Sequence, residues 1–231
     1  MPERTTVKAG PKSEETRERI FNAALALFLD RGFETATMRE IAVAAEVATG
    51  AAYYYFASKE AIIMEFYRRS SSDMQPKIKL ALEGAAGLEK RLVELIRVKL
   101  THFEPHRAIL RALLRNGADP SLPLSPFGVH TKEIRDTDIA WFRTILVDCG
   151  VRIPKDLEPH LPGVLWFFQM GVIFFWVVDQ SPGQQRSSRL LTLATKSVTS
   201  LIRLSALPLM RPVRKTALEL VEIVVGATES A

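Results

Sequence analysis

The sequence predicts an all-α protein in which a three-helix N-terminal domain precedes a larger helical bundle. Apolar residues recur at helical spacing through most of the 231 residues, no β-type alternation of any length occurs, and stretches rich in proline and glycine separate the periodic segments. A hydrophobic content of 47% is enough to fill a real core. We expect a disordered arm over residues 1–13, a small domain over 14–60 and the larger domain over 61–231.

The first helix is predicted over residues 14–30. Ser13 is a suitable N-cap, and Gly32 follows the helix as a C-terminal stop. An apolar stripe with a period near 3.6 residues gives the helix one buried face. This stripe consists of Ile20, Phe21, Ala24, Leu25, Leu27 and Phe28.

Two short helices and a longer one are predicted next. Thr37 and Glu40 form a capping-box pattern at the start of a helix over residues 38–45. A tight turn leads to a helix over residues 49–55. Ser58 then caps a fourth helix that reaches about residue 82, and we expect Pro76 to kink or break it.

The remainder of the chain is also predicted to be helical. Pro105 interrupts one pair of helices, and two proline-rich loops cover residues 116–126 and 150–162. The expected helices span residues 88–103, 106–115, 129–147, 162–178, 184–206 and 213–225.

The excess positive charge of the chain lies outside the N-terminal domain. The net charge is +5 and the pI is near 9.4, which suits a polyanionic partner without requiring one. However, residues 1–70 contain ten basic and ten acidic side chains, so the excess lies in residues 71–231. Any contact with nucleic acid must therefore come from a few well-placed groups.

Two features bear on the cellular compartment. Cys149 is the only cysteine, and with no partner motif it is expected to be a core residue in a reducing, cytoplasmic environment. The N-terminus lacks the apolar segment of a signal peptide. Residues 163–178 are nearly all apolar but are shorter than the roughly 20 residues of a membrane span, so we expect a helix buried on all sides, in a core or a subunit interface.

Residues 37–59 have the pattern of a helix-turn-helix. The second of these helices begins with small residues and ends with three tyrosines, Tyr53, Tyr54 and Tyr55. Small side chains let a helix approach base edges in the DNA major groove, and hydroxyls can donate to phosphates. This stretch therefore predicts an element that reads double-stranded DNA.

Over nearly 50 residues, this region resembles the DNA-binding domain of the TetR family of transcriptional regulators. The remaining residues agree with the family only in helical content and length. The residues that carry the resemblance are Ile20, Ala23, Ala24, Leu27, Phe28, Gly32, Phe33, Thr37, Ile41, Ala42, Val47, Gly50, Tyr53, Phe56, Ser58, Lys59 and Glu60.

The resemblance implies a set of DNA-contacting residues. Ile41, Val47 and Phe56 are expected to form a small core that fixes the angle between the two helices of the motif. Lys59 resembles the phosphate-contacting lysine of the family, although it could be an ordinary solvated lysine. The expected DNA-binding set is Thr37, Arg39, Thr49, Gly50, Ala51, Tyr53, Tyr54 and Lys59.

Some of these positions have simpler explanations, and others depart from the family. Thr37 could serve only as a helix cap, and one tyrosine, for which Tyr55 is favoured, is expected to pack inside. Glu46 stands where the family usually has glycine in the turn, and a left-handed conformation there would cost about 1 kcal/mol. Ala52 replaces a larger aliphatic residue. These two changes bear on the geometry of the recognition helix.

In the TetR family, the C-terminal domain binds a ligand and forms the dimer. We expect the helices near 162–178 and 184–206 to form a four-helix dimer interface, although their apolar stripe could instead be internal core. An apolar or flat effector is expected in an aromatic pocket, although aromatic runs more often form core. The candidate pocket residues are Phe103, Trp141, Phe142, Trp166 and Phe167.

No catalytic, metal or cofactor site is expected. His102 and His106 have metal-ligand spacing, but Pro105 lies between them, and residues 84–87 lack the lysine of a phosphate loop. The acid-free, basic segment 180–218 is either a solvated face or a site for an acidic ligand or partner.

The sequence thus favours a ligand-responsive homodimeric repressor that binds a palindromic operator and is released by a small-molecule effector. Two other functions would each require a further feature. An enzyme fused to a DNA-binding head would need a nucleophile, base or metal set, which the sequence does not offer. A membrane-associated sensor would need residues 163–178 to lie in lipid.

Overall fold

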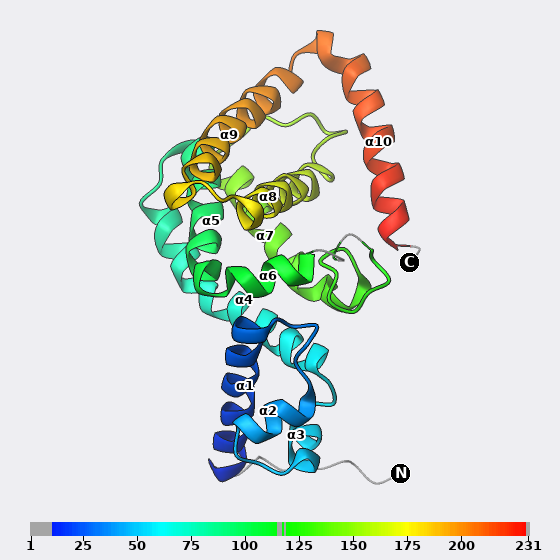
Figure 1. The fold of residues 1–231 in the computed structure, drawn as a ribbon. Coiled ribbons are helices and arrows are strands. Elements are labelled where there is room, and N and C mark those ends of the chain that lie inside the picture. The colour runs from blue at the N-terminus through cyan, green and yellow to red at the C-terminus, as the bar shows by residue number, and fades with distance from the viewer. Residues whose placement is uncertain (1–10, 115–116, 118, 230–231) are drawn as a thin grey trace. The chain divides into compact units, whose positions relative to one another are not determined.

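The computed structural model describes residues 11–114, 117 and 119–229, which are mostly helical with no strand among them (Figure 1). The all-α prediction is confirmed. The chain divides into two compact units, residues 1–66 and 67–231. The division falls within one helix, a few residues after the boundary expected at residue 60. Each unit is described by itself below.

Unit 1 contains α1 (Pro11–Arg31), α2 (Met38–Ala44), α3 (Thr49–Tyr55) and the first residues of α4 (Lys59–Glu83). The stripe of α1 is largely buried, as its spacing predicts, and α1 packs against α2, which in turn packs against α3. Gly32, in the left-handed region with φ of 87°, ends α1, and its amide donates to the Phe28 carbonyl at 3.1 Å. The buried apolar residues of this unit include Ile20, Ala24, Phe28, Phe33, Ile41, Ala42, Ala52, Phe56, Ile62 and Ile63.

The predicted start of α1 was wrong. The helix begins at Pro11, so residues 11–13 belong to it rather than to a disordered arm, and Ser13 is not its N-cap. Proline suits the first turn of a helix because its missing N–H would have no intrahelical partner there. The Ser13 hydroxyl lies 3.1 Å from the Tyr55 hydroxyl, which joins the first turn of α1 to the end of α3. Residues 1–10 of the expected arm lie outside the described residues.

The expected break at Pro76 was also wrong, because α4 continues through it to Glu83. Proline removes one intrahelical hydrogen bond, and the cost is smallest where water can reach the freed carbonyl. Pro76 and Ser72, the residue four positions before it, are both exposed. Met74 and Ile78, on either side of Pro76, remain buried in the core of unit 2.

Unit 2 contains the rest of α4 and the remaining helices. In Figure 1, α8 lies in the middle of this unit, and it packs against α5, α6, α7 and α9. The predicted helices are confirmed, with ends that differ by a few residues. They are α5 (Gly87–Phe103), α6 (Arg107–Leu114), α7 (Lys132–Asp148), α8 (Leu161–Val178), α9 (Gln185–Ser205) and α10 (Arg211–Glu229), with short 3₁₀ turns η1 (Glu104–His106), η2 (Val129–Thr131), η3 (Pro182–Gln184) and η4 (Pro208–Met210).

Helix α8 is buried on one side within the single chain, so the expected burial on all sides would need a second subunit to cover its other face. Leu165, Gln169 and Trp176 are buried in the core, whereas Phe175 and Val178 are exposed. With 18 residues and a mean hydropathy of 1.9, α8 is long and apolar enough to cross a membrane, but half of it is buried within unit 2. A helix with one face in a core and an apolar face outside it is typical of a subunit interface.

The junction between α8 and α9 is fixed by one carboxylate. Asp179 accepts hydrogen bonds from the Ser181 amide at 2.9 Å and from the Ser187 amide and hydroxyl at 2.9 and 2.6 Å. The hydrogen bond from the Ser187 hydroxyl is the largest cause that holds the pKa of Asp179 far below its ordinary value. Because Asp179 follows α8 directly and bonds to the first turn of α9, it holds the ends of the two helices together.

Candidate functional site

The first candidate site is the exposed surface of α3. Tyr53 and Tyr54 are 52% and 81% exposed, whereas Tyr55 is half-buried against Ser13. Ala52 is fully buried and faces the small core of unit 1. Tyr55 is the least exposed of the three tyrosines, as predicted, but it is half-buried rather than part of the core.

The N-terminal half of α3 presents little bulk. Thr49 and Gly50 are exposed and Ala51 is half-buried, and a Cβ on Gly50 would meet no atom within 4 Å. Among the described residues no side chain caps this helix, so the amides of Thr49 and Gly50 remain available to an acceptor. An exposed helix with small residues at its start and two phenols at its end has the shape needed to enter a major groove.

A left-handed residue sets the angle between α2 and α3. Glu46 has φ of 55°, and its amide donates to the Val43 carbonyl at 3.1 Å. The Val47 amide donates to the Ala42 carbonyl at 3.0 Å. These two bonds form a Schellman motif, in which the left-handed position normally carries glycine. The strain anticipated for Glu46 is therefore present in the turn.

Glu46→Gly is expected to raise the free energy of unfolding by about 1 kcal/mol, because glycine adopts a left-handed conformation without a Cβ penalty. Chemical denaturation followed by circular dichroism measures this gain. Glu46→Ala is the matched control, since it removes the carboxylate and keeps the Cβ. Equal stabilities of the glycine and alanine variants would show that the turn is not strained.

Two residues of the expected DNA-binding set lie at the start of α2. The Thr37 hydroxyl accepts from the Glu40 amide at 3.3 Å and donates to Glu40 Oε2 at 2.8 Å, while the Thr37 amide donates to the same oxygen at 3.0 Å. The predicted capping box is confirmed. The hydrogen bond from the Thr37 hydroxyl is the largest cause that lowers the pKa of Glu40, and the bond from the Thr37 amide lowers it further. The Thr37 hydroxyl has no hydrogen left for a phosphate. Arg39 is exposed on the same helix.

Lys59 holds the connection between α1 and α2. Its Nζ donates to the carbonyls of Phe33 and Glu34 at 2.9 and 3.0 Å and lies 4.5 Å from the centre of the Phe33 ring. These two carbonyls use two of its three N–H groups, and the described residues of unit 1 offer no further acceptor for the third. Lys59 is therefore a structural residue of unit 1 that keeps one donor for a phosphate.

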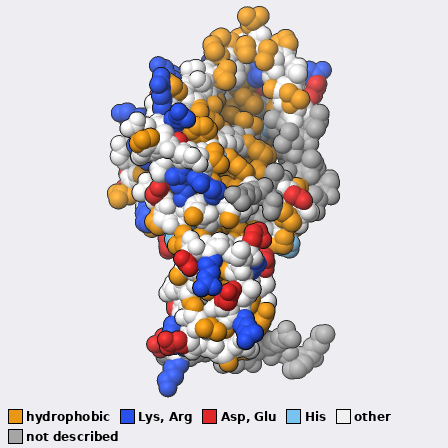
Figure 2. Space-filling model, in the orientation of Figure 1, with side chains coloured by type: hydrophobic (Ala, Val, Ile, Leu, Met, Phe, Trp, Pro, Cys, Tyr) orange, Lys and Arg blue, Asp and Glu red, His pale blue; other side chains and the backbone are white. Residues whose placement is uncertain are grey.

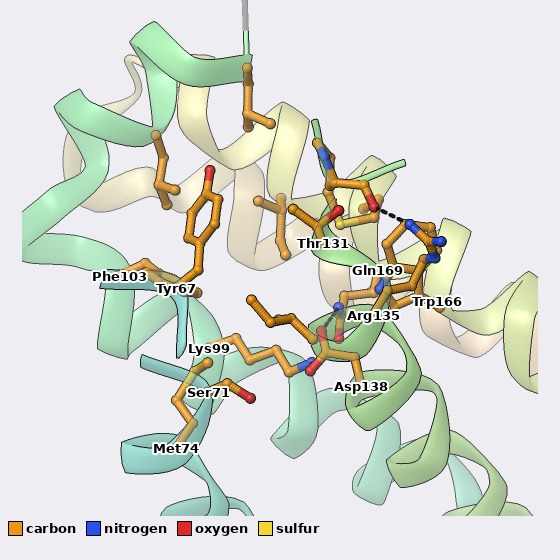
Figure 3. Close-up of a pocket in the computed structure, with 16 residues that line it drawn as sticks. Tyr67, Ser71, Met74, Lys99, Phe103, Thr131, Arg135, Asp138, Trp166 and Gln169 are labelled. Atoms are coloured by element: carbon orange, nitrogen blue, oxygen red, sulfur yellow. Dashed lines mark hydrogen bonds and ion pairs between the residues drawn. The ribbon is translucent and has the colours of Figure 1, made fainter. Parts of the chain in front are cut away.

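The second candidate site is a cavity of about 110 Å³ inside unit 2 (Figure 3). Of the five expected pocket residues, Phe103 and Trp166 line it. The other three are placed elsewhere: Phe142 is fully buried in the core, Phe167 stacks on Phe127 at 5.8 Å, and Trp141 packs against the core from outside. The lining consists of Tyr67, Ser71, Met74, Lys99, Phe103, Leu110, Leu114, Pro126, Thr131, Ile134, Arg135, Asp138, Trp166, Gln169, Met170 and Ile173.

A polar cluster of Lys99, Asp138 and Gln169 lies among these mostly apolar residues. Asp138 Oδ1 lies 2.8 Å from Lys99 Nζ, and Asp138 Oδ2 accepts from Gln169 Nε2 at 3.3 Å. Lys99 and Gln169 are 1% and 0% exposed. Burial lowers the pKa of Lys99, and the charge of Asp138 partly offsets this effect. The cluster is the polar feature of the pocket that sequence reasoning missed.

Arg135 also lines the pocket but is held by other groups. Its Nη1 donates to the carbonyls of Pro126 and Gly128 at 2.9 and 3.0 Å, and its guanidinium lies 5.8 Å from the centre of the Trp166 ring. Arg135 thus fixes the loop that precedes α7 against α8. Figure 3 shows Arg135 and Trp166 on the same side of the pocket, away from Lys99.

The weaker candidates from the sequence do not assemble into sites. Within the described residues, no group of three or more His, Cys, Asp or Glu side chains could hold a metal ion. His102 Nδ1 lies 3.5 Å from Lys77 Nζ, a cation that disfavours metal binding beside it. Cys149 is half-buried, and burial raises the pKa of its thiol, as expected for a core cysteine rather than a nucleophile.

The sequence of the chain is similar to that of known regulatory proteins. Residues 20–66 match the family model described as bacterial regulatory proteins, tetR family, and residues 91–218 match the tetracyclin repressor-like C-terminal domain. YerO of Bacillus subtilis, an HTH-type transcriptional regulator, is 31% identical over 167 residues, which are 69% of this chain and 57% of YerO. The chain spans about half the length of the sequence relatives that it matches.

The similarity extends to solved structures. A TetR-family regulator from Syntrophomonas wolfei superposes with a TM-score of 0.63 at 20% identity, over 80% of this chain and 95% of the other. FadR of Bacillus subtilis, solved in complex with stearoyl-CoA, superposes with a TM-score of 0.61 at 18% identity, over 77% and 96%. At these identities the structures show a shared fold.

Proposed function

The chain belongs to the TetR family of transcriptional regulators, and we propose that it is a ligand-responsive homodimeric repressor that acts in the cytoplasm. In this proposal, two copies of α3 bind the half-sites of a palindromic operator, and a small-molecule effector in the pocket of unit 2 releases the DNA. The relatives it matches are regulators rather than enzymes, and we assign the chain no catalytic role.

The observation that carries this proposal is the exposed surface of α3. Tyr53 and Tyr54 have no role in the core of unit 1, yet they stand on a helix whose other side is anchored through Ala52. Large exposed aromatic residues on a rigid helix are typical of a binding surface. The groups that would donate hydrogen bonds to DNA phosphates are the hydroxyls of Tyr53 and Tyr54, the first amides of α3, and the side chains of Arg39 and Lys59.

An exposed apolar surface supports dimerisation. Phe175 and Val178 of α8 are exposed, as are Leu193, Leu201 and Leu204 of α9. Figure 2 shows hydrophobic side chains gathered over the part of unit 2 that contains α8 and α9. Two such helix pairs would bury these residues in a four-helix contact, as expected for a symmetric dimer. The apolar residues of α9 serve both the core and the proposed dimer contact, since Ile202 is buried in the core of unit 2 while Leu201 is exposed.

Helix α4 supports a link between effector and DNA. It begins at Lys59, next to the helix-turn-helix, and its residues Tyr67, Ser71 and Met74 line the pocket. An effector that favours one position of α4 would change the separation of the two α3 helices in a dimer. By reciprocity, operator DNA must then weaken effector binding by the same factor as the effector weakens DNA binding.

Tyr53→Ala is expected to weaken binding to the operator by about 1–3 kcal/mol per lost contact while leaving helicity unchanged. Thr49→Ala should act in the same direction. Fluorescence anisotropy with a duplex selected from random sequences measures the affinity, at the same salt concentration for every variant. Val43→Ala is the control, because Val43 is exposed on α2 and lies outside the proposed contact set. Unchanged affinity in both test variants would show that α3 is not the reading helix.

A further inference from the structure

The polar cluster in the pocket indicates which class of effector the protein binds. We propose that the effector is a small, neutral apolar compound with a hydroxyl group, such as a phenol, whose hydroxyl binds between Lys99 and Gln169. This inference rests on the proposed function, since it assigns the ligand of the same pocket.

Unused hydrogen-bonding capacity is the main evidence. Gln169 Oε1 is buried and has no hydrogen-bond partner within the described part of the chain. The amide orientation is fixed, because Gln169 Nε2 donates to a carboxylate, which can only accept. Lys99 Nζ carries three N–H groups, and Asp138 is the one partner found for them among the described residues. A buried acceptor and a buried donor left open in this way each cost free energy until a ligand or water supplies the missing group.

The required head group must both donate and accept. A hydroxyl does so with one atom, since it can donate to Gln169 Oε1 and accept from Lys99 Nζ. Both oxygens of Asp138 already have donors, so this carboxylate does not need the ligand. A hydroxyl at this place would complete the cluster without changing its charge.

Charged head groups fit the cluster less well. A carboxylate could not donate to Gln169 Oε1 and would lie beside the negative charge of Asp138. An ammonium would face the charges of Lys99 and Arg135. Both N–H groups of Arg135 Nη1 are used by the carbonyls of Pro126 and Gly128, which hold this cation at the loop before α7. Burial of an unpaired charge in such a pocket is strongly unfavourable.

The rest of the pocket selects the size and polarity of the ligand body. Most of its lining is apolar, and Figure 3 shows Phe103 and Met74 at the end near Lys99 and Trp166 on the side of Gln169. The cavity of about 110 Å³ is somewhat smaller than the engineered apolar cavity of about 150 Å³ that binds benzene. The pocket in this conformation therefore accommodates a body of about one ring.

The test is a ligand series that varies the head group on one ring. Phenol, toluene, benzoate and benzylamine are titrated against the full-length protein without DNA by isothermal titration calorimetry at pH 7. Phenol is expected to bind about tenfold or more tightly than toluene, a difference of about 1.4 kcal/mol, because its hydroxyl satisfies the buried groups that toluene leaves open. Benzoate and benzylamine are expected to bind more weakly than phenol.

A substitution localises the preference. Gln169→Met removes the open acceptor and also the Nε2 donor to Asp138, while it keeps the length and apolar volume of the side chain. The preference for phenol over toluene should then fall to about twofold. Thr195→Val is the matched control, because Thr195 is also buried, its hydroxyl has no hydrogen-bond partner among the described residues, and it does not line the pocket. That variant should keep the wild-type preference for phenol.

Several results would overturn the proposal. Equal binding of phenol and toluene by the wild-type protein would show that the polar cluster does not contact the ligand. Tightest binding of benzoate or of benzylamine would assign the pocket to ions, and binding of lauroyl-CoA but of none of the four compounds would assign it to a long acyl chain. The series is measured without DNA, so none of these results depends on operator binding. A failure of the repressor function would appear instead in the anisotropy experiment with Tyr53→Ala.

Discussion

Asp138→Asn is expected to destabilise the protein by about 3–5 kcal/mol at neutral pH, because it leaves the buried Lys99 ammonium without its counter-charge. The Lys99 side chain is nearly inaccessible to water, and Asp138 is its one ionic partner in the described chain. Asparagine keeps the size of the side chain, so the loss reports on charge rather than on packing. The free energy of unfolding from chemical denaturation measures it.

The loss should depend on pH in a defined direction. Burial already lowers the pKa of Lys99 in the folded protein, and removal of Asp138 lowers it further. The unfolded chain then binds more protons than the folded one, so stability rises with pH between the folded pKa and the unfolded value of about 10.4. The difference between the variant and the wild type should therefore shrink as the pH is raised toward about 10.

A second acid on the same helix provides the control. Asp136 of α7 is exposed and is ion-paired with the exposed Lys132, so Asp136→Asn should cost less than about 1 kcal/mol. If Asp136→Asn and Asp138→Asn were equally mild, or if the deficit of Asp138→Asn grew with pH, Lys99 would not be a buried charge that depends on Asp138.

Leu201→Glu is expected to convert the dimer into monomers and to abolish tight operator binding. The proposed dimer contact places Leu201 of α9 against a second copy of the chain, where two introduced carboxylates would be buried together. Leu201 is exposed in unit 2, so the fold of the single chain should be unaffected. Sedimentation equilibrium at micromolar concentration measures the assembly state, and anisotropy measures operator binding.

The control for this variant is another exposed leucine. Leu80 lies on α4, outside the proposed dimer surface, and is at least as exposed as Leu201. Leu80→Glu should remain a dimer and should bind the operator with wild-type affinity. A dimeric Leu201→Glu variant that still binds the operator would show that the contact between subunits lies elsewhere.

Much of unit 1 could be predicted because its signals are local. The capping box of Thr37 and Glu40 and the stop at Gly32 each involve residues a few positions apart. The strain at Glu46 was predictable for the same reason, since one turn requires a left-handed residue. The start of α1 is harder to predict, because Pro11 lies in a polar stretch that also contains Gly10, and proline is common both in such stretches and in the first turn of a helix.

The pocket was harder to predict because its polar cluster joins three helices. Lys99 comes from α5, Asp138 from α7 and Gln169 from α8, and no sequence spacing relates them. A partial signal was present, because Lys99 follows Leu95 and Ile96 at helical spacing and so falls on the buried face of α5. Trp141 and Phe142 were expected in the pocket but do not line it. These neighbours differ by about 100° around α7, so aromatic content alone does not tell which side chain faces a cavity.

Selection of bound sequences from a pool of random DNA duplexes tests the central claim most directly. The account predicts that the wild-type protein enriches an inverted repeat, whose half-sites are separated by about one helical turn or a multiple of it. The Tyr53→Ala variant should enrich the same repeat weakly or not at all. Recovery of no common sequence, or of a single unrepeated site, would contradict the account of two α3 helices that read one duplex together.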